Sequence, residues 1–409
     1  MSQTDEHVGS CANGPLTGVR VIELAHIMAG PVCGLMLADM GADVVKVEKI
    51  GTGDDSRRFL PPAIEGESAA FMMMNRNKRG IALDLKHEDG KAALLTLLKD
   101  ADVVIENFRH DTMARLGLEY DTLSEINPGL IYCEISGFGR TGPYRERGGF
   151  DLVAQGMAGL MSVTGEGPDR PPVKIGPPIT DITAGILGAM GVSAAYSARL
   201  KTGKGQRVDT SLFEAGIIQT FWQSAIAFAT GVAPEPMGSA HPLNAPYQSI
   251  ATKDGWINIG CANQKNWLRM LDVIDKPALT DDSRFVTNEK RMANRSELIS
   301  ALEEIFVLRP TSEWLSLLND GGVPAGPLLD VVDMHNDTQA IAREMIVEVE
   351  HPVAGFVKSL GSPVKFHGTP GGVRNAAPVI GQHSREVLRE AGYAEADIQS
   401  LIDVGAVGE

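Results

Sequence analysis

Cysteine is scarce in this chain of 409 residues, and the few cysteines lie far apart. No two of them form a C-x-x-C pair, the spacing that is typical of zinc sites and redox motifs. A scattered set fits reduced thiols in the cytoplasm better than a disulfide framework. The four are Cys11, Cys33, Cys133 and Cys261. We therefore expect a cytoplasmic protein without structural disulfide bonds.

Positive charge and long apolar runs are also lacking. The net charge is −15, which disfavours a general nucleic-acid binder but leaves room for one small basic pocket. The longest apolar candidate, residues 182–198, is interrupted by Gly, Ser and Thr, so we expect no membrane-spanning segment. Residues 1–14 are polar without an apolar signal core and are predicted to be a disordered lead-in.

Several catalytic motifs are missing as well. The turn at 26–31 lacks G-x-G-x-x-G, whose glycines let a backbone approach a pyrophosphate, so nicotinamide or flavin binding is disfavoured. There is no G-x-S-x-G elbow and no H-E-x-x-H pair. The run T-G-K-G-Q at 202–206 lacks the P-loop spacing and fits a β-turn. We expect no metal site and no tightly bound cofactor.

The first half of the chain alternates predicted strands and helices. Strands are expected at 19–24, 43–48, 81–85, 102–106 and 130–135, and helices at 32–40 and 88–99. Such strand–helix–strand units imply parallel strands with right-handed crossovers. The pattern predicts an α/β fold with a doubly wound, Rossmann-like large domain.

The pattern changes after about residue 222. Strands at 247–251 and 256–260 flank an Asp-Gly turn and predict a β-hairpin, and helices follow near 263–274, 296–307 and 311–319. We expect a large-domain segment at 15–222, a small α+β domain with linkers at 223–330, and a return to the large domain at 331–409. Two helices near 383–392 and 394–403 belong to that last segment.

One stretch, residues 177–191, combines a single carboxylate with an almost uncharged helix pattern. After Asp181 the glycines Gly185, Gly188 and Gly191 recur every three positions, which leaves one helical face open to a close neighbour. Asp181 itself fits either a helix N-cap or a functional carboxylate. Asp151, at the end of the G-G-F-D turn at 148–151, has the same two interpretations.

Taken together, these segments resemble the class III CoA-transferase family (the CaiB/BaiF type), which includes formyl-CoA, carnitine-CoA and dicarboxylate-CoA transferases. The matching stretches begin near residue 14 and continue through most of the chain. They are the segments 15–24, 29–31, 41–48, 75–79, 106–108, 148–151, 180–181, 202–206, 322–327 and 380–383. No single one of them suffices, but the set is specific.

The resemblance implies an enzyme that moves CoA from an acyl-CoA thioester to a carboxylic acid, with both small molecules as substrates. It places Asp181 at the family's catalytic aspartate, which carries the acyl group and then CoA in covalent intermediates. It also implies a site for the CoA thioester and for the reacting acids. The implied binding residues are His26, Met28, Ala29, Lys49, Leu83, Lys86, Asn107, Phe108, Arg115, Phe150 and Asp151.

Departures from the family pattern narrow the substrate. Met28 stands where formyl-CoA transferases have a glutamine, and their glycine-rich lid is not evident between residues 238 and 262. The segment 241–248 instead resembles the dicarboxylate branch, such as succinyl-CoA:glutarate enzymes.

The main alternative is an α-methylacyl-CoA racemase, whose paired histidine is replaced here by Phe150, a residue that cannot move a proton. A CoA-binding protein without catalysis is a further alternative. The family also implies an interlocked homodimer.

Overall fold

The structure, a computed structural model, describes residues 14–409. Most of the lead-in predicted at 1–14 therefore lies outside the described residues. The described chain divides into two compact units. Unit 1 comprises the described residues up to Ala158, then Ile175–Gln219 and Thr338–Glu409, and unit 2 comprises Gly159–Lys174 and Thr220–Asp337.

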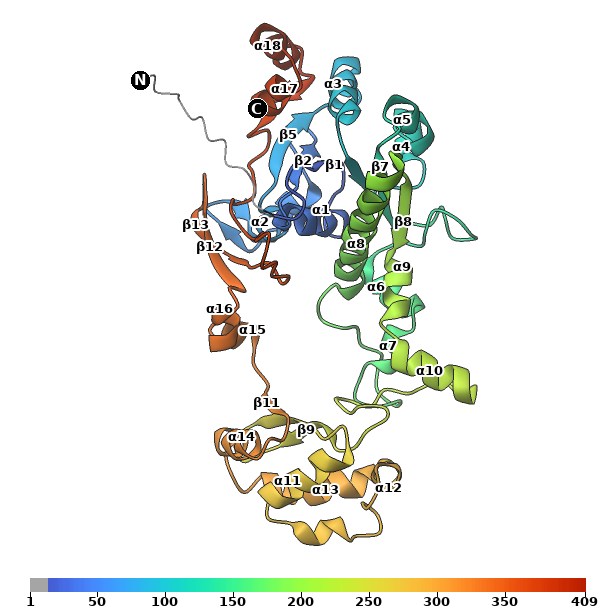
Figure 1. Cartoon of the computed structure of the whole chain (residues 1–409), viewed down its shortest axis with the longest axis vertical. Coiled ribbons are helices and arrows are strands. Elements are labelled where there is room, and N and C mark those ends of the chain that lie inside the picture. The colour runs from blue at the N-terminus through green and yellow to red at the C-terminus, as the bar shows by residue number, and fades with distance from the viewer. Residues whose placement is uncertain (1–13) are drawn as a thin grey trace. The chain divides into compact units, whose positions relative to one another are not determined.

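A seven-stranded sheet forms the centre of unit 1, in the order β14-β5-β2-β1-β6-β7-β8. All neighbouring strands are parallel except β14 and β5. The chain leaves β1 toward β2 and β5 on one side and toward β6, β7 and β8 on the other (Figure 1). Such a reversal opens a crevice at the carboxyl ends of the strands. The strands are β1 (Arg20–Glu23), β2 (Asp43–Glu48), β5 (Arg79–Leu83), β6 (Val103–Glu106), β7 (Ile131–Ser136), β8 (Arg207–Ser211) and β14 (Val407–Gly408).

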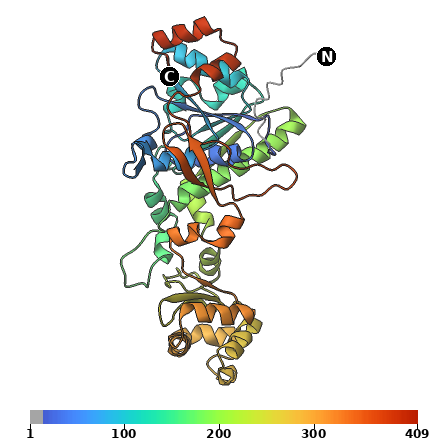
Figure 2. The ribbon, with the colours of Figure 1, turned by 90° about the vertical axis from the view of Figure 1, so that its left-hand side faces the viewer.

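Helices cover both faces of this sheet (Figures 1 and 2). One core contains side chains of α1, α6, α8 and α9, and the other contains side chains of α3, α4, α5, α17 and α18. The first set is α1 (Ala29–Asp39), α6 (Asp151–Met157), α8 (Ile179–Thr202) and α9 (Leu212–Ile218). The second is α3 (Glu88–Lys99), α4 (Thr112–Leu116), α5 (Tyr120–Ile126), α17 (Ser384–Glu390) and α18 (Glu395–Asp403). The α/β class with a large, mainly parallel sheet is confirmed.

The glycines of α8 let this helix lie directly on its neighbours. A Cβ atom at Gly185 would stand 2.7 Å from the carbonyl oxygen of Ala29, and one at Gly191 would stand 2.6 Å from Val208. By length and composition alone α8 is apolar enough to span a membrane, contrary to the expectation for residues 182–198. Its buried residues pack on α1 and on the sheet, and a buried core helix passes the same compositional test.

The rest of unit 1 consists of short elements and a hairpin. The strands β12 and β13 pair antiparallel and pack with α2 in a small separate core. These elements are η1 (Asp55–Arg58), β3 (Ala63–Ile64), β4 (Glu67–Ser68), α2 (Ala69–Asn75), α16 (Thr338–Ala342), β12 (Ile346–His351) and β13 (Gly355–Leu360).

Unit 2 contains a three-stranded antiparallel sheet in the order β11-β10-β9, and its hairpin confirms the one predicted at 247–260. Trp267 and Phe285 lie at the centre of its core. The strands are β9 (Tyr247–Ala251), β10 (Trp256–Gly260) and β11 (Ala325–Pro327). The helices are α7 (Leu160–Val163), α10 (Phe221–Thr230), α11 (Gln264–Val273), η2 (Pro277–Thr280), α12 (Asn288–Ala293), α13 (Arg295–Phe306), α14 (Thr311–Asp320) and α15 (Val331–His335).

Candidate active site

A cavity of about 900 Å³ opens at the carboxyl ends of four parallel strands of unit 1. Leu24 follows β1, Lys49 follows β2, Leu83 ends β5, and Phe108 follows β6. This is where doubly wound sheets bind their ligands. Six of the residues predicted from the sequence line this one cavity: His26, Lys49, Leu83, Lys86, Phe108 and Arg115.

Three of these residues give the cavity rim a positive charge. Lys49, Lys86 and Arg115 are exposed. Within residues 14–409, neither lysine forms an ion pair, and Arg115 makes only surface contacts, an ion pair with Asp111 and a hydrogen bond to the hydroxyl of Thr112, each at 3.4 Å. The carboxylate of Glu48, which also lines the cavity, is occupied by two bonds from Arg57 at 2.8 and 2.7 Å. These exposed cations suit phosphate groups on a ligand.

The inner wall of the cavity is built on His26 and Phe108, whose rings meet edge to face at 4.8 Å. Asn107 holds the backbone of His26 at both ends, because its side-chain oxygen accepts from the N–H and its amide donates to the carbonyl, each at 2.8 Å. Burial lowers the pKa of His26, which favours the uncharged imidazole.

Glu106, which is not among the site residues predicted from the sequence, fixes the other side of this wall. Its carboxylate accepts from the N–H of Phe108 at 2.7 Å and from Arg140 at 2.6 Å. Burial raises the pKa of Glu106 to about 7, against the opposing effect of Arg140. The signal in the sequence that could have identified Glu106 is a charged residue at the end of an apolar strand.

The helix α1 begins beside the cavity, with Met28 at its N-cap position. The side chain of Met28 makes no capping bond, and Pro31 has no N–H. In the described chain, the N–H groups of Ala29 and Gly30 therefore have no acceptor. Such a helix start carries partial positive charge and donates readily to an anion.

Asp181 lies in the first turn of α8, and Asp151 begins α6. The N-cap interpretation is wrong for both, because the cap positions are Pro178 and Phe150. Asp151 instead stabilises the start of α8 from outside, since its Oδ1 accepts from the N–H of Thr180 at 3.1 Å and from its hydroxyl at 2.8 Å.

The carboxyl group of Asp181 has an unusual acidity. Burial, and next the negative charge of Asp151, raise its pKa from 3.8 to about 7. Asp151 is itself held by Gln155, which donates to its Oδ2 at 2.8 Å. A carboxylate with a pKa near neutral is a better nucleophile or base than an ordinary one, and about half of it is ionised at pH 7.

The residues predicted from the sequence thus fall into two groups in unit 1. The first lines the cavity or, like Asn107, holds its wall. The second stands at the helix starts: Asp151 and Asp181, with Phe150 fully on the surface at 72% exposure. The loop 26–29 connects the groups, because Ala29 contacts α8 at Gly185, one turn beyond Asp181.

The profile of CoA-transferase family III matches residues 16–384. The chain belongs to this family. Succinate–glutarate CoA-transferase of Agrobacterium fabrum is 38% identical over 382 residues, covering 92% of this chain and 95% of that protein. Acetyl-CoA:oxalate CoA-transferase of Acetobacter aceti is 38% identical over 387 residues, covering 94% and 97%. A crystal structure of a CaiB/BaiF family protein from Brucella suis has a TM-score of 0.83 and 40% identity, covering 93% of this chain and 100% of that one.

Membership of CoA-transferase family III confirms the resemblance drawn from the motifs and makes the protein an enzyme, a transferase of sulfur-containing groups. CoA thioesters are the substrates of this class. No group of three His, Cys, Asp or Glu side chains between residues 14 and 409 is arranged to hold a metal ion.

Proposed function

We propose that this enzyme transfers CoA from an acyl-CoA thioester to a dicarboxylate through covalent intermediates on Asp181. The observation that carries the proposal is the pairing of a cation-rimmed cavity with a half-buried carboxylate of pKa about 7, connected by the loop 26–29. The cavity suits the phosphate-bearing end of CoA, and the carboxylate suits attack on its thioester.

The reaction proceeds by four acyl transfers. The Asp181 carboxylate attacks the thioester carbonyl, forming a C–O bond and breaking the C–S bond, to give a mixed anhydride and CoA thiolate. The thiolate attacks the aspartyl carbonyl and releases the donor acid, leaving an aspartyl-CoA thioester. The acceptor carboxylate then attacks this thioester to form a second anhydride. The released thiolate attacks the acceptor carbonyl, giving the new acyl-CoA and free Asp181.

Each step passes through an oxyanion that needs donors in a dry site. The unpaired N–H groups at the start of α1 are suited to this task, because Ala29 lies against α8 near Asp181. Lys49, Lys86 and Arg115 hold phosphates in this scheme, and His26 with Phe108 packs against the apolar parts of CoA.

The dicarboxylate class rests on the relatives. Glutarate and oxalate acceptors appear in the names of two proteins that are equally identical to this chain, at 38%, so overall identity does not choose between them. The segment 241–248 supports the dicarboxylate branch. A racemase would need a second proton-transfer group, and the exposed Phe150 cannot provide one.

We also propose a cytoplasmic homodimer. The helix α10 is apolar and exposed, with Phe221 at 76% and Phe228 at 90% exposure, and exposed apolar surfaces of this kind usually mark an interaction site. Cys33, Cys133 and Cys261 are free thiols, which suits a reducing compartment. Sedimentation that returns a monomer at micromolar concentration would contradict the dimer.

The test is to trap the intermediate. The enzyme is incubated with succinyl-CoA, treated with hydroxylamine or borohydride, digested and mapped by mass spectrometry. We expect modification of the peptide that contains Asp181, less of it when excess glutarate is added before trapping, and none in Asp181→Ala. Normal turnover by Asp181→Ala would rule out the covalent route.

A further inference from the structure

The loop between β1 and α1 has an unfavourable backbone conformation. Ile27 has φ of 67°, in the left-handed region, which side chains branched at Cβ avoid strongly. No glycine occurs between Glu23 and Gly30 to relieve it. A conformation of this kind persists only when the surrounding structure imposes it.

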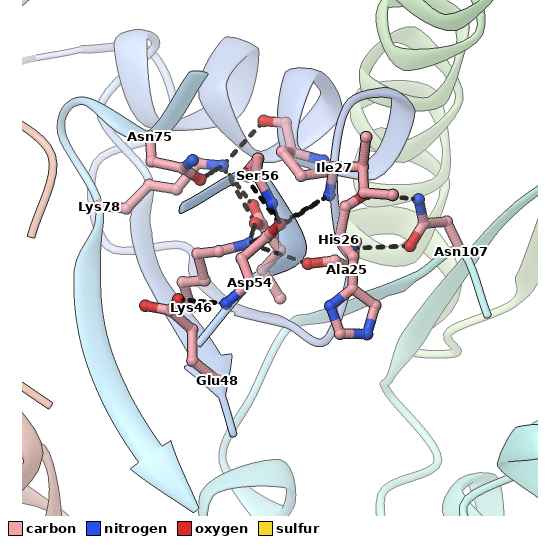
Figure 3. Close-up of polar contacts among 12 residues, drawn as sticks. Ala25, His26, Ile27, Lys46, Glu48, Asp54, Ser56, Asn75, Lys78 and Asn107 are labelled. Atoms are coloured by element: carbon pink, nitrogen blue, oxygen red, sulfur yellow. Dashed lines mark hydrogen bonds and ion pairs between the residues drawn. The ribbon is translucent and has the colours of Figure 1, made fainter. Parts of the chain in front are cut away.

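Side chains from distant parts of the chain impose this conformation (Figure 3). Asp54 accepts from the N–H of Ile27 with its two oxygens, at 3.1 and 3.2 Å. Lys46 donates to the carbonyl of Ala25 at 2.9 Å, and Lys78 donates to that of Pro31 at 2.8 Å. Asn107 also holds the N–H and the carbonyl of His26. Together these side chains hold five backbone N–H or carbonyl groups between residues 25 and 31.

The groups that hold the loop form one buried cluster. Lys46 contacts Asp54 at 2.9 Å and Glu23 at 3.0 Å, and Glu23 also contacts Lys78 at 2.8 Å. The side chains of all four residues have no exposed surface. Two lysines and two carboxylates balance, so the cluster is neutral and its bonds are not weakened by solvent.

The cluster is closely packed and hydrogen-bonded on its other sides. A Cβ atom at Gly34, on the facing side of α1, would lie 1.8 Å from Oε2 of Glu23. Asp54 is fixed in turn by Ser56, whose N–H and hydroxyl both donate to its Oδ1 at 2.8 Å. Lys46 and Ser56 hold the pKa of Asp54 well below its usual range, against the effect of burial, so Asp54 is a permanent acceptor.

We infer that Asp54 is a positioning residue for catalysis: through the N–H of Ile27, the buried cluster holds loop 26–29 where it links the CoA cavity to the Asp181 helix. This inference rests on the proposed function for its effect on turnover. A purely structural ion pair would stabilise the fold without setting the geometry of this loop, and the chain offers such a pair for comparison. Asp39 contacts Arg76 at 2.6 Å at the far end of α1, and both are buried.

The test compares Asp54→Asn with Asp39→Asn, each losing one buried carboxylate charge. We expect Asp54→Asn to lower kcat/KM for acyl-CoA by about 10- to 100-fold, mostly through kcat, because small misplacements of catalytic geometry have effects of this size. Asp39→Asn should lower the unfolding midpoint, with kcat and KM within about twofold of wild type. Equal kinetic effects of the two variants would overturn the inference.

Ile27→Gly provides a rescue experiment. Glycine adopts a positive φ without strain, so in the Asp54→Asn background it should restore about 3- to 10-fold of the lost kcat/KM. In the wild-type background it should have no such benefit. Absence of rescue would also overturn the inference.

Hydrogen exchange separates this inference from the proposed function. The amides of His26 and Ile27, which donate to Asn107 and Asp54, should exchange faster in Asp54→Asn than in wild type or Asp39→Asn, with no substrate present. Unchanged exchange of these amides in Asp54→Asn would refute the inference that Asp54 holds the loop, whatever the turnover of the variant. Loss of protection together with unchanged kcat/KM refutes its catalytic role, whereas a wild-type enzyme that turns over no acyl-CoA refutes the proposed function.

Discussion

Replacing Asp151 by asparagine should change the pH at which the enzyme becomes active. Burial is the larger cause of the raised pKa of Asp181, and the charge of Asp151 is the second. Asparagine removes that charge but keeps an oxygen to accept from Thr180. In wild type, the side-chain amide of Gln155 donates to the Asp151 carboxylate at 2.8 Å. In the variant, the NH₂ group of the asparagine faces this amide, so that hydrogen bond is lost.

The expected shift follows from the order of these causes. Because burial remains, the pKa of Asp181 should fall from about 7 by about one unit, which corresponds to about 1.4 kcal/mol. With a one-unit shift the ionised fraction at pH 6 rises about fivefold, from roughly a tenth to a half. The acid limb of the pH profile of kcat/KM reports this pKa in the free enzyme. Its midpoint should therefore move down, and the plateau above pH 8 should fall because the nucleophile is less basic.

The profile should be measured from pH 5 to 9 with one acyl-CoA and one acceptor. Glu125→Gln, which removes an exposed carboxylate from α5, controls for the loss of one negative charge. An acid limb that stays in place, or moves to higher pH, in Asp151→Asn would refute the coupling between the two carboxyl groups.

Three further predictions concern the cavity, the helix contact and the pH dependence of stability. Lys49→Ala and Lys86→Ala should each raise KM for acyl-CoA about 5- to 10-fold in low salt and leave kcat nearly unchanged, as loss of an exposed phosphate contact requires; a fall confined to kcat would contradict this role. Gly185→Ala, whose Cβ would stand 2.7 Å from a carbonyl oxygen of α1, should lower the free energy of unfolding by about 1–3 kcal/mol in urea, whereas Gly148→Ala, with open space around it, should not. The free energy of unfolding of Asp181→Asn should exceed that of wild type by a margin that grows from pH 4 to pH 8, to at most about 4 kcal/mol. The reason is that the raised pKa of Asp181 means that the fold disfavours the ionised carboxyl group. A margin that is constant with pH would disprove the pKa shift.

Local sequence patterns predicted the elements best. The strand at 43–48 and the helix at 88–99 have the predicted bounds, because a short run rich in valine marks the strand and amphipathic spacing marks the helix within the segment itself. The helix α1 begins at Ala29 and not at residue 32. Its first turn is Ala-Gly-Pro, and glycine there masks the start although proline is well suited to it.

The site was predictable only where motifs or topology pointed to it. Residues that follow parallel strands meet at one edge, so the position of His26 and Asn107 could be inferred from the fold. The buried cluster was not predicted, because its members are separated along the chain and burial is not visible in sequence. In retrospect Glu23 and Lys46 are register partners on adjacent strands, and opposite charges inside two apolar strands were a usable signal.

The position of β14 has a consequence for synthesis on the ribosome. This strand, at residues 407–408, covers the outer edge of β5 at residues 79–83, and Gly405 before it lines the cavity. At about 5–20 residues per second, β5 leaves the ribosome on the order of 15–60 s before β14 exists. During that interval its edge is unpaired and open to other chains. Nascent chains stalled before Ala406 should therefore depend on chaperones, and slow translation of the second half should reduce the yield of active enzyme.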